Sequence, residues 1–244
     1  CALPIYLEGL EHKDQQRIEF FAKQMVDLFA PTNFLATNPD ALERAVETEG
    51  ESLVKGLENL VRDIEAHQGE ILPTLADGSA FELGTNIATA KGAVIYRNEM
   101  MELLQFAPTT ETVYKKPVII FPPWINKYYV MDLRPENSLI RWIVDQGYTL
   151  FVVSWKNPDK SYSDKGLEDY IEKGYLKAID VAKEVTGSKA VNAVGYCIAG
   201  TTLSLTLSLL KKRRQKPISS ATFFTTLTDF SDQGEFTVFL QDDF

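Results

Sequence analysis

Histidine and cysteine are scarce in this chain of 244 residues, which contains two of each. The two cysteines, Cys1 and Cys197, cannot build the disulfide framework that is typical of small secreted domains, so we expect a reducing, cytoplasmic setting. The sequence has no run of about 18 uncharged apolar residues, and no transmembrane helix is expected. Its first residues also lack the basic start and the long apolar run of a signal peptide.

Other familiar kinds of functional site are missing as well. The sequence has no glycine-rich phosphate loop, no metal-ligand spacing and no internal repeat. The formal net charge of -9, from 25 basic and 34 acidic residues, argues against a surface that binds nucleic acid. The 45% hydrophobic content is ordinary for a globular protein, so we expect a packed core and a partner other than nucleic acid.

Residues 1–90 are predicted to form a helical N-terminal region. Apolar residues at helical spacing predict a first helix over about residues 11–30. Asn38-Pro39 supplies an N-cap and a first-turn proline for a second helix that ends near residue 48. A third helix carries one apolar stripe, which we expect to pack as a core face: Leu53, Leu57, Leu60, Val61 and Ile64.

Residues 91–244 show a different pattern, in which short apolar strands alternate with amphipathic helices. A hairpin is expected near residues 93–104. It is followed by strands at 117–121, 149–155, 190–195 and 221–224, and by helices at 139–144, 166–185 and 201–214. This alternation predicts a mostly parallel sheet covered by helices on both faces. The order matches the first part of an α/β-hydrolase fold, without its late strands, in which the nucleophile follows the fifth strand.

The segment 190–202 places a cysteine between an apolar strand and an apolar helix. We interpret this as a nucleophile elbow, with Cys197 where serine is usual and with Gly195 and Gly200 as the elbow glycines. Side chains at the two glycine positions should collide with the neighbouring strand and helix. Cys197 should be strained and exposed, with its thiolate stabilised by the positive end of the helix. A lone cysteine is more often a small buried residue, but the flanking strand and helix favour the elbow.

Neither histidine is well placed to act as a base for Cys197. His12 and His67 both precede the α/β part, and we expect both to be surface residues. Chain order in this fold is nucleophile, acid, histidine, and no histidine follows Cys197. The chain is therefore expected to be a fragment, to be incomplete, or to be a relative that has lost its triad. The acid and the histidine would lie beyond Phe244, and we expect little or no turnover from these residues.

Seven segments, in the right order, resemble poly(3-hydroxyalkanoate) synthases. The similarity runs from about Arg17 to the end of the chain. It is carried by residues 31–39, 98–103, 121–129, 132–138, 154–158, 195–201 and 227–232. Because these segments are independent of one another, their combination is far more specific than the elbow alone.

The resemblance implies an acyltransferase that polymerises (R)-3-hydroxyacyl-CoA, such as 3-hydroxybutyryl-CoA, into polyhydroxyalkanoate with release of CoA. Cys197 would carry the acyl group as a thioester, and the backbone N–H of Ile198 would donate to the oxyanion. The CoA thioester is the substrate, and neither a cofactor nor a metal is expected. The resemblance also implies a cytoplasmic homodimer at the granule surface, with the growing polyester chain as a partner.

Other residues of the family-like segments are expected to have supporting roles. The second oxyanion donor should lie at Trp124 or beyond, because the two residues that follow the strand ending at Phe121 are prolines without N–H groups. Four residues are expected to be structural: Trp124 and Trp155 by packing, and Asp132 and Arg134 by pairing.

Two other functions are also open. A thioesterase or depolymerase-like α/β hydrolase would use the same elbow but would release free hydroxy acid rather than polymer. A non-catalytic granule-associated or dimer-partner module would use the apolar stripe at 53–64, and replacement of Cys197 by alanine would leave its function intact. The motif at 126–129 and the helical N-terminal region favour the synthase.

Overall fold

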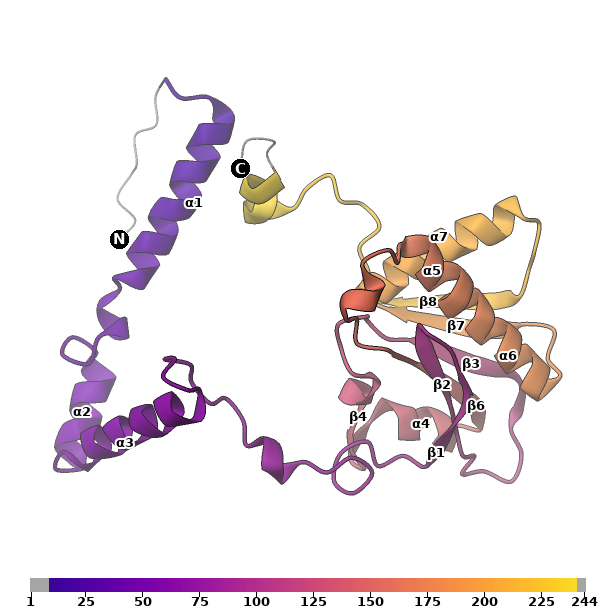
Figure 1. The fold of residues 1–244 in the computed structure, drawn as a ribbon, viewed down its shortest axis with the longest axis horizontal. Helices are drawn as coiled ribbons and strands as arrows, with labels where there is room; N and C mark the ends of the chain where they lie inside the picture. Colours follow the sequence, from indigo (N-terminus) through magenta and orange to yellow (C-terminus); the bar gives the residue numbers. More distant parts are fainter. Residues whose placement is uncertain (1–8, 241–244) are drawn as a thin grey trace. The chain divides into compact units, whose positions relative to one another are not determined.

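The structure, a computed structural model, describes residues 9–240, so that Cys1 lies outside the described residues. The described residues form two compact units, one of residues 9–77 together with 230–240, and one of residues 78–229 (Figure 1). The sequence suggested a division at 90/91 instead. Residues near 90 go with the second unit because Ala88 and Ala90 donate their backbone N–H groups to Asp132, at 2.9 and 2.8 Å. The two ranges as domains stay a prediction.

The first unit contains the three predicted helices, α1 (His12–Leu28), α2 (Pro39–Glu47) and α3 (Glu51–Ala66), and two short 3-10 helices, η1 (Pro31–Asn33) and η6 (Gly234–Leu240). Asn38 caps α2 as expected, since its side chain accepts from the N–H groups of Asp40 and Ala41 at 3.0 and 3.2 Å. Gly50, with φ 87°, separates α2 from α3. The Phe239 ring of η6 packs edge-on against Phe20 of α1, with 5.3 Å between ring centroids.

Four of the five residues of the apolar stripe of α3 are exposed and Ile64 is half-buried, so the prediction of the stripe as a core face was wrong. None of the three helices has a buried residue. Leu53 is 43% exposed and Leu57 is 63% exposed. Helical periodicity shows which side chains share a face, but it does not show what packs against that face.

The second unit is built on a six-stranded sheet with the order β1-β2-β6-β3-β7-β8. The strands are β1 (Gly92–Arg97), β2 (Met101–Phe106), β3 (Tyr114–Phe121), β6 (Tyr148–Trp155), β7 (Val191–Tyr196) and β8 (Ile218–Phe224). β1 and β2 form the predicted antiparallel hairpin, β2 is antiparallel to β6, and all other pairs are parallel. A separate small ribbon pairs β4 (Asp132–Arg134) with β5 (Asn137–Ser138).

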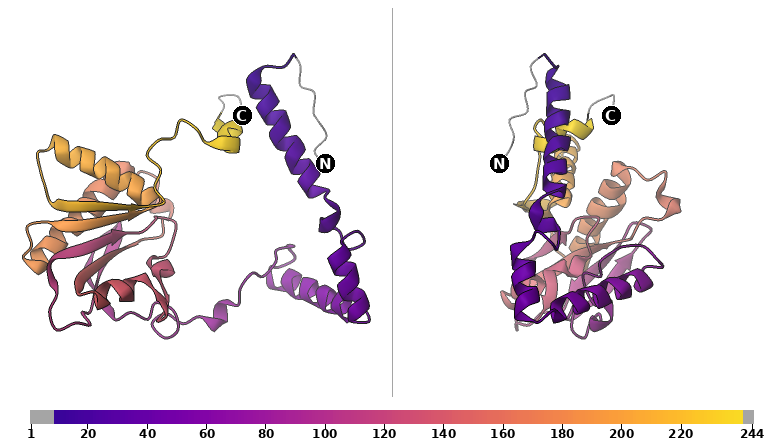
Figure 2. Two further views of the ribbon diagram at one scale, coloured as in Figure 1. Left: turned by 180° about the vertical axis from the view of Figure 1, so that it is seen from behind. Right: turned by 90° about the vertical axis from the view of Figure 1, so that its left-hand side faces the viewer.

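Helices cover both faces of this sheet, as predicted for an α/β-hydrolase-like fold. One face packs on α4 (Leu139–Asp145), and the other packs on α6 (Lys177–Thr186) and α7 (Ile198–Lys212) (Figures 1 and 2). Alternate strand residues divide between two core clusters. Ile120 and Val152 join Ile140 of α4, whereas Phe121 and Val153 join Leu203 of α7. β7 is the fifth strand of the sheet, and Cys197 follows it directly.

The helix predicted at 166–185 is not uniform. It consists of α5 (Leu167–Asp169), the π-helix η5 (Tyr170–Leu176) and α6. A Cβ on Gly174 in the π-helical turn would lie 2.7 Å from the ring of Trp155, so only glycine lets the ring lie there. Within residues 9–240, no helix has both the length and the apolar character needed to cross a membrane.

Candidate functional site

Cys197 is the single residue between the end of β7 and the start of α7. Its side chain is exposed, and its backbone has φ 55° and ψ -127°. A residue with a side chain reaches this region only at a conformational cost of about 1–3 kcal/mol. The strain and the exposure predicted from the sequence are therefore present, and the catalytic role of the thiol stays a prediction.

The two elbow glycines allow β7 and α7 to approach closely. A Cβ on Gly195 would lie 2.6 Å from the Cα of Gly200, and a Cβ on Gly200 would lie 1.9 Å from Oγ1 of Thr226. The expected collisions exist, but two details need correction. Ala199 occupies the second position after Cys197 and Gly200 the third, so the spacing is not Gly-x-nucleophile-x-Gly. The group that excludes a side chain at Gly200 belongs to the segment after β8, not to β7 or α7.

The end of β8 and the loop that follows it, residues 224–227, hold the elbow, and the sequence analysis missed this role. The carbonyl of Phe224 accepts from the Cys197 N–H at 2.9 Å, and that of Leu227 accepts from the Thr201 hydroxyl at 2.6 Å. Thr225 has φ 42°, a second strained residue beside the first. The sequence gives no signal for this role, because a Thr-Thr pair after a strand is typical of many loops.

Backbone N–H groups at the elbow are available for an oxyanion. Ile198 is the first residue of α7, so its N–H has no acceptor inside the helix. The N–H of Gly200 is already bonded to the Cys197 carbonyl at 2.9 Å. In the loop after β3, Asn126 donates to Pro123 at 3.3 Å, whereas the N–H groups of Trp124 and Ile125 have no acceptor among the described residues.

Of the four residues expected to be structural, the two tryptophans act by packing. Trp124 stacks on Tyr170 with ring centroids 4.4 Å apart, and Trp155 is buried and donates its indole N–H to the Pro122 carbonyl at 2.7 Å. The pairing expected between Asp132 and Arg134 was wrong, since no ion pair joins these two described residues. Asp132, only 1% exposed, instead fixes the chain near Ala90 by accepting its N–H.

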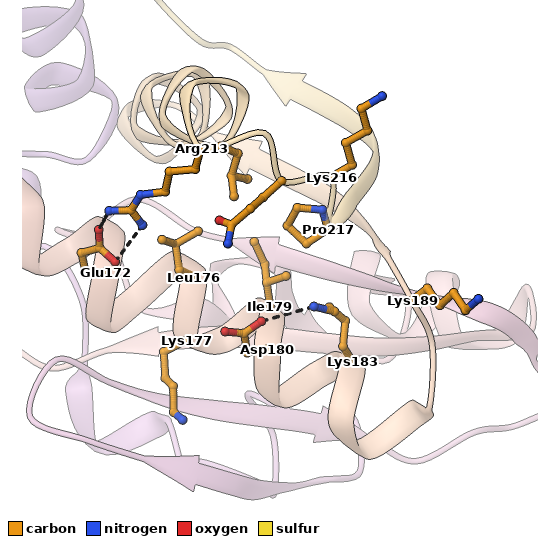
Figure 3. A pocket seen from close by; sticks show the side chains of 12 residues that line it. Glu172, Leu176, Lys177, Ile179, Asp180, Lys183, Lys189, Arg213, Lys216 and Pro217 are labelled. Carbon is orange, nitrogen blue, oxygen red and sulfur yellow. Dashed lines mark hydrogen bonds and ion pairs between the residues drawn. The ribbon is translucent and has the colours of Figure 1, made fainter.

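Two hollows help to locate the site. A small one of about 270 Å³ lies beside the elbow and is lined by Tyr196 and Phe224 together with Val130, Met131, Asn137 and Leu139. A larger one of about 480 Å³ is lined mainly by charged side chains of α6 and of the α7 end (Figure 3). Lys189 and Pro217 of that larger hollow precede β7 and β8, whereas Cys197 follows β7. The larger hollow therefore lies at the opposite edge of the sheet and takes no part in the thiol site.

No imidazole is available within the second unit. Residues 78–229 contain no histidine. In the first unit, His12 is exposed as expected, while His67 is half-buried with Nδ1 2.8 Å from the Asp63 carbonyl. The elbow, the thiol and the backbone donors thus come from one unit that has no histidine to act as a base.

Residues 5–143 match the family described as "Poly-beta-hydroxybutyrate polymerase (PhaC) N-terminus". The chain is 44% identical over 232 residues to a poly(3-hydroxyalkanoate) polymerase of Methylorubrum extorquens, covering 95% of this chain and 38% of that protein. It is 45% identical over 230 residues to a poly(3-hydroxyalkanoate) polymerase subunit of Cupriavidus necator, covering 94% and 38%. The chain thus spans about two-fifths of the length of these relatives. A solved structure from a study of Rhizomucor miehei esterases is similar with a TM-score of 0.45 and 13% identity, over 66% of this chain and 50% of the esterase.

Proposed function

The chain belongs to the poly-beta-hydroxybutyrate polymerase (PhaC) family, and on this premise we propose that Cys197 accepts (R)-3-hydroxyacyl groups from CoA and passes them to a growing polyester. The observation that carries the proposal is the exposed thiol of Cys197 on a strained backbone between β7 and α7. A cysteine without a special role can be exposed without backbone strain, whereas a nucleophile at an elbow needs the strained turn in order to project toward its substrate.

The first chemical step is a thioester exchange. The Cys197 thiolate attacks the thioester carbonyl of the acyl-CoA, a carbon–sulfur bond to Sγ forms, and the bond to the CoA sulfur breaks. CoA leaves as a thiolate and takes a proton from water. Because the product is again a thioester, the acyl group stays activated for the next transfer.

The oxyanion of this step needs two donors that point to the same place. We assign the N–H of Ile198 as one donor, because it is the first in α7. We assign the other to the N–H of Trp124 or Ile125, since the two prolines before them have none and the N–H of Asn126 already has an acceptor. The hollow beside Tyr196 and Phe224 would hold part of the acyl group.

Chain extension needs a base. The 3-hydroxyl group of a waiting unit attacks the Cys197 thioester, so that an ester bond forms and the bond between the acyl carbon and Sγ of Cys197 breaks. The Cys197 thiolate is released, and the base takes up the proton of the hydroxyl group. Since residues 78–229 contain no histidine, we propose that the base comes from outside this unit. The second unit alone would therefore be acylated once but would not extend a polymer.

The remaining parts of the proposal concern partners and location. The relatives' names indicate a poly(3-hydroxyalkanoate) as their product, and we propose (R)-3-hydroxyacyl-CoA as the substrate from which this chain would build such a polyester. We further propose a homodimer in the cytoplasm at the granule surface. The exposed apolar stripe of α3 supports an apolar partner of this kind, because such a face is stabilised by burial.

The test is single-turnover acylation of the chain by 3-hydroxybutyryl-CoA at pH 8.5, where a large share of an ordinary thiol is ionised. We expect at most one CoA released per chain and an acyl group on the peptide that contains Cys197, with Cys1→Ser present throughout as background. Cys197→Ala should abolish both signals.

Three results would contradict the proposal or favour an alternative. Acylation that is equal in Cys197→Ala would show that the thiol is not the acceptor. Continuous release of CoA with free 3-hydroxybutyrate would favour the hydrolase. Absence of acylation, together with granule binding that is unchanged in Cys197→Ala, would favour the non-catalytic module.

A further inference from the structure

Tyr175 is a fully buried tyrosine that contacts the nucleophile elbow from behind. It lies in the π-helix η5, and its side chain is 0% exposed. Its hydroxyl donates to the carbonyl of Ala199 at 2.7 Å. Ala199 follows the proposed oxyanion donor Ile198, so this bond holds the same turn that orients the donor.

The other side of Tyr175 contacts the chain that leads into the second donor. Its ring stacks on Phe121, the last residue of β3, with 4.1 Å between centroids and 12° between planes. It also lies 5.7 Å from the ring of Trp155, whose indole N–H is bonded to the carbonyl of Pro122. One side chain thus contacts both elements from which the oxyanion donors come.

The sheet alone does not fix these two elements relative to each other. The last paired residues of β3 and β7 are Phe121 and Gly195. Both donor segments, the loop after Phe121 and the turn after Cys197, lie beyond this pair. Contacts other than the ladder must therefore set the separation between the two N–H groups.

The hydroxyl of Tyr175 keeps the same protonation state, and therefore the same hydrogen bond, over the working pH range of the thiol. Burial raises the pKa of Tyr175, and interactions with Thr202 and Trp124 oppose the rise only in part. The hydroxyl therefore stays protonated at any pH at which the thiol would work, and it remains a hydrogen-bond donor to Ala199. The indole N–H of Trp124 is buried nearby without an acceptor of good geometry.

We infer that Tyr175 is a positioning residue, which sets the separation of the two oxyanion donors by bonding the Ala199 carbonyl and stacking on Phe121. It does not touch the reacting atoms. The inference rests on the proposed acyl transfer at Cys197. Donor placement must hold to within about 0.5 Å for full effect, so loss of a single bond at this point should be measurable.

The experiment compares two reactions of the same thiol in Tyr175→Phe. Alkylation by iodoacetamide is a displacement at carbon that forms no oxyanion, whereas acylation by 3-hydroxybutyryl-CoA forms one. We expect the alkylation rate to stay within about twofold of the unsubstituted chain and the single-turnover acylation rate to fall about tenfold or more, since loss of a whole donor costs about 100- to 1,000-fold.

Tyr170→Phe is the matched control, because Tyr170 lies in the same π-helix, its hydroxyl makes no hydrogen bond to the described residues, and phenylalanine keeps the ring that stacks on Trp124. It should leave both rates unchanged. Trp155→Phe removes the bond to Pro122 on the loop side and should give the same selective loss as Tyr175→Phe, which keeps the test available if Tyr175→Phe does not fold.

Equal loss in both reactions, or no loss in either, would overturn the role of Tyr175. A selective loss of acylation in Tyr170→Phe as well would also overturn it, because the effect would then belong to the whole aromatic cluster. If the unsubstituted chain is alkylated normally but never acylated, the proposed function itself is wrong, and the inference falls with it.

Discussion

At the scale of single residues, the strained backbone of Cys197 lowers the stability of the folded protein and keeps one sulfur atom exposed. Its φ of 55° and ψ of -127° suit glycine, which has no Cβ to clash. We expect Cys197→Gly to be more stable than Cys197→Ala by about 1 kcal/mol. Relief of strain contributes about 1–3 kcal/mol, and the extra freedom of glycine in the unfolded chain offsets about 0.4–1 kcal/mol.

Urea unfolding of the two variants measures this difference, provided that both give the same m-value. The comparison with alanine removes the thiol from both proteins, so that the backbone is the only difference of interest. Equal midpoints would mean that the elbow is not strained in solution.

Tyr175 allows a second prediction, on the pH dependence of stability. Burial raises the pKa of its phenol above the value of about 10 that holds in the unfolded chain. Its contribution is therefore complete below about pH 10 and is lost as the pH rises above that value, because the unfolded chain releases the proton first. Tyr175→Phe cannot ionise, so its stability should fall less steeply between about pH 10 and 11.5.

Burial also raises the pKa of Tyr128, Tyr162 and Tyr170, so some alkaline loss should persist in every variant. The measured quantity is the difference in slope between Tyr175→Phe and the unsubstituted chain, from urea midpoints at several pH values. Parallel curves would contradict the buried, protonated phenol.

The sequence revealed some site residues and not others for a physical reason. Cys197 and Gly195 could be recognised in the sequence because a strained turn accepts few residue types, so that the residue types themselves indicate the turn. Tyr175 and Thr226 could not be recognised in the sequence, because their roles depend on tertiary contacts that bring them close to the elbow. A tyrosine in an amphipathic helix and a threonine in a loop are ordinary until those contacts are known.

At the scale of elements, the hairpin, the mostly parallel sheet and the helices on both its faces were predicted from the alternation of apolar segments, but the strand order and the π-helix were not. Over a single wide turn, apolar spacing cannot separate a π-helix from an α-helix, and only the contact of Gly174 with Trp155 marks the place. The prediction that the apolar stripe of α3 packs in a core failed for a different reason. The apolar residues do share one face of the helix, but the sequence of a helix does not show which element packs against that face.

Two glycines within helices provide a matched prediction at this scale. Gly174→Ala should destabilise the protein by about 1–3 kcal/mol, because its Cβ would lie 2.7 Å from the buried Trp155 ring. Gly56→Ala in α3 has nothing within 4 Å of the new Cβ, and it should increase helix stability by about 0.8–1 kcal/mol.

Urea unfolding monitored by tryptophan fluorescence reports Gly174→Ala, and helical circular dichroism on heating reports Gly56→Ala. A neutral Gly174→Ala would show that the ring of Trp155 can move aside. In that case the π-helix would not depend on this close contact.

At the scale of the whole molecule, the buried core is unevenly distributed between the two units. Among the described residues, every buried hydrophobic side chain except Val238 lies between Met100 and Leu210. No residue of α1, α2 or α3 is fully buried, and helices with little packed surface gain little stability beyond their own hydrogen bonds. The chain should therefore open in two steps of very different free energy.

Hydrogen exchange of the chain at low concentration tests this difference directly. Amides of α3 should exchange at least on the order of 100-fold faster than amides of β3 and β7, because opening α3 exposes no core. Protection of α3 equal to that of β3 would mean that the stripe of Leu53, Leu57 and their neighbours is covered within the chain. A protection that grows with protein concentration would show that a second copy covers the stripe, as expected if the proposed dimer uses this face.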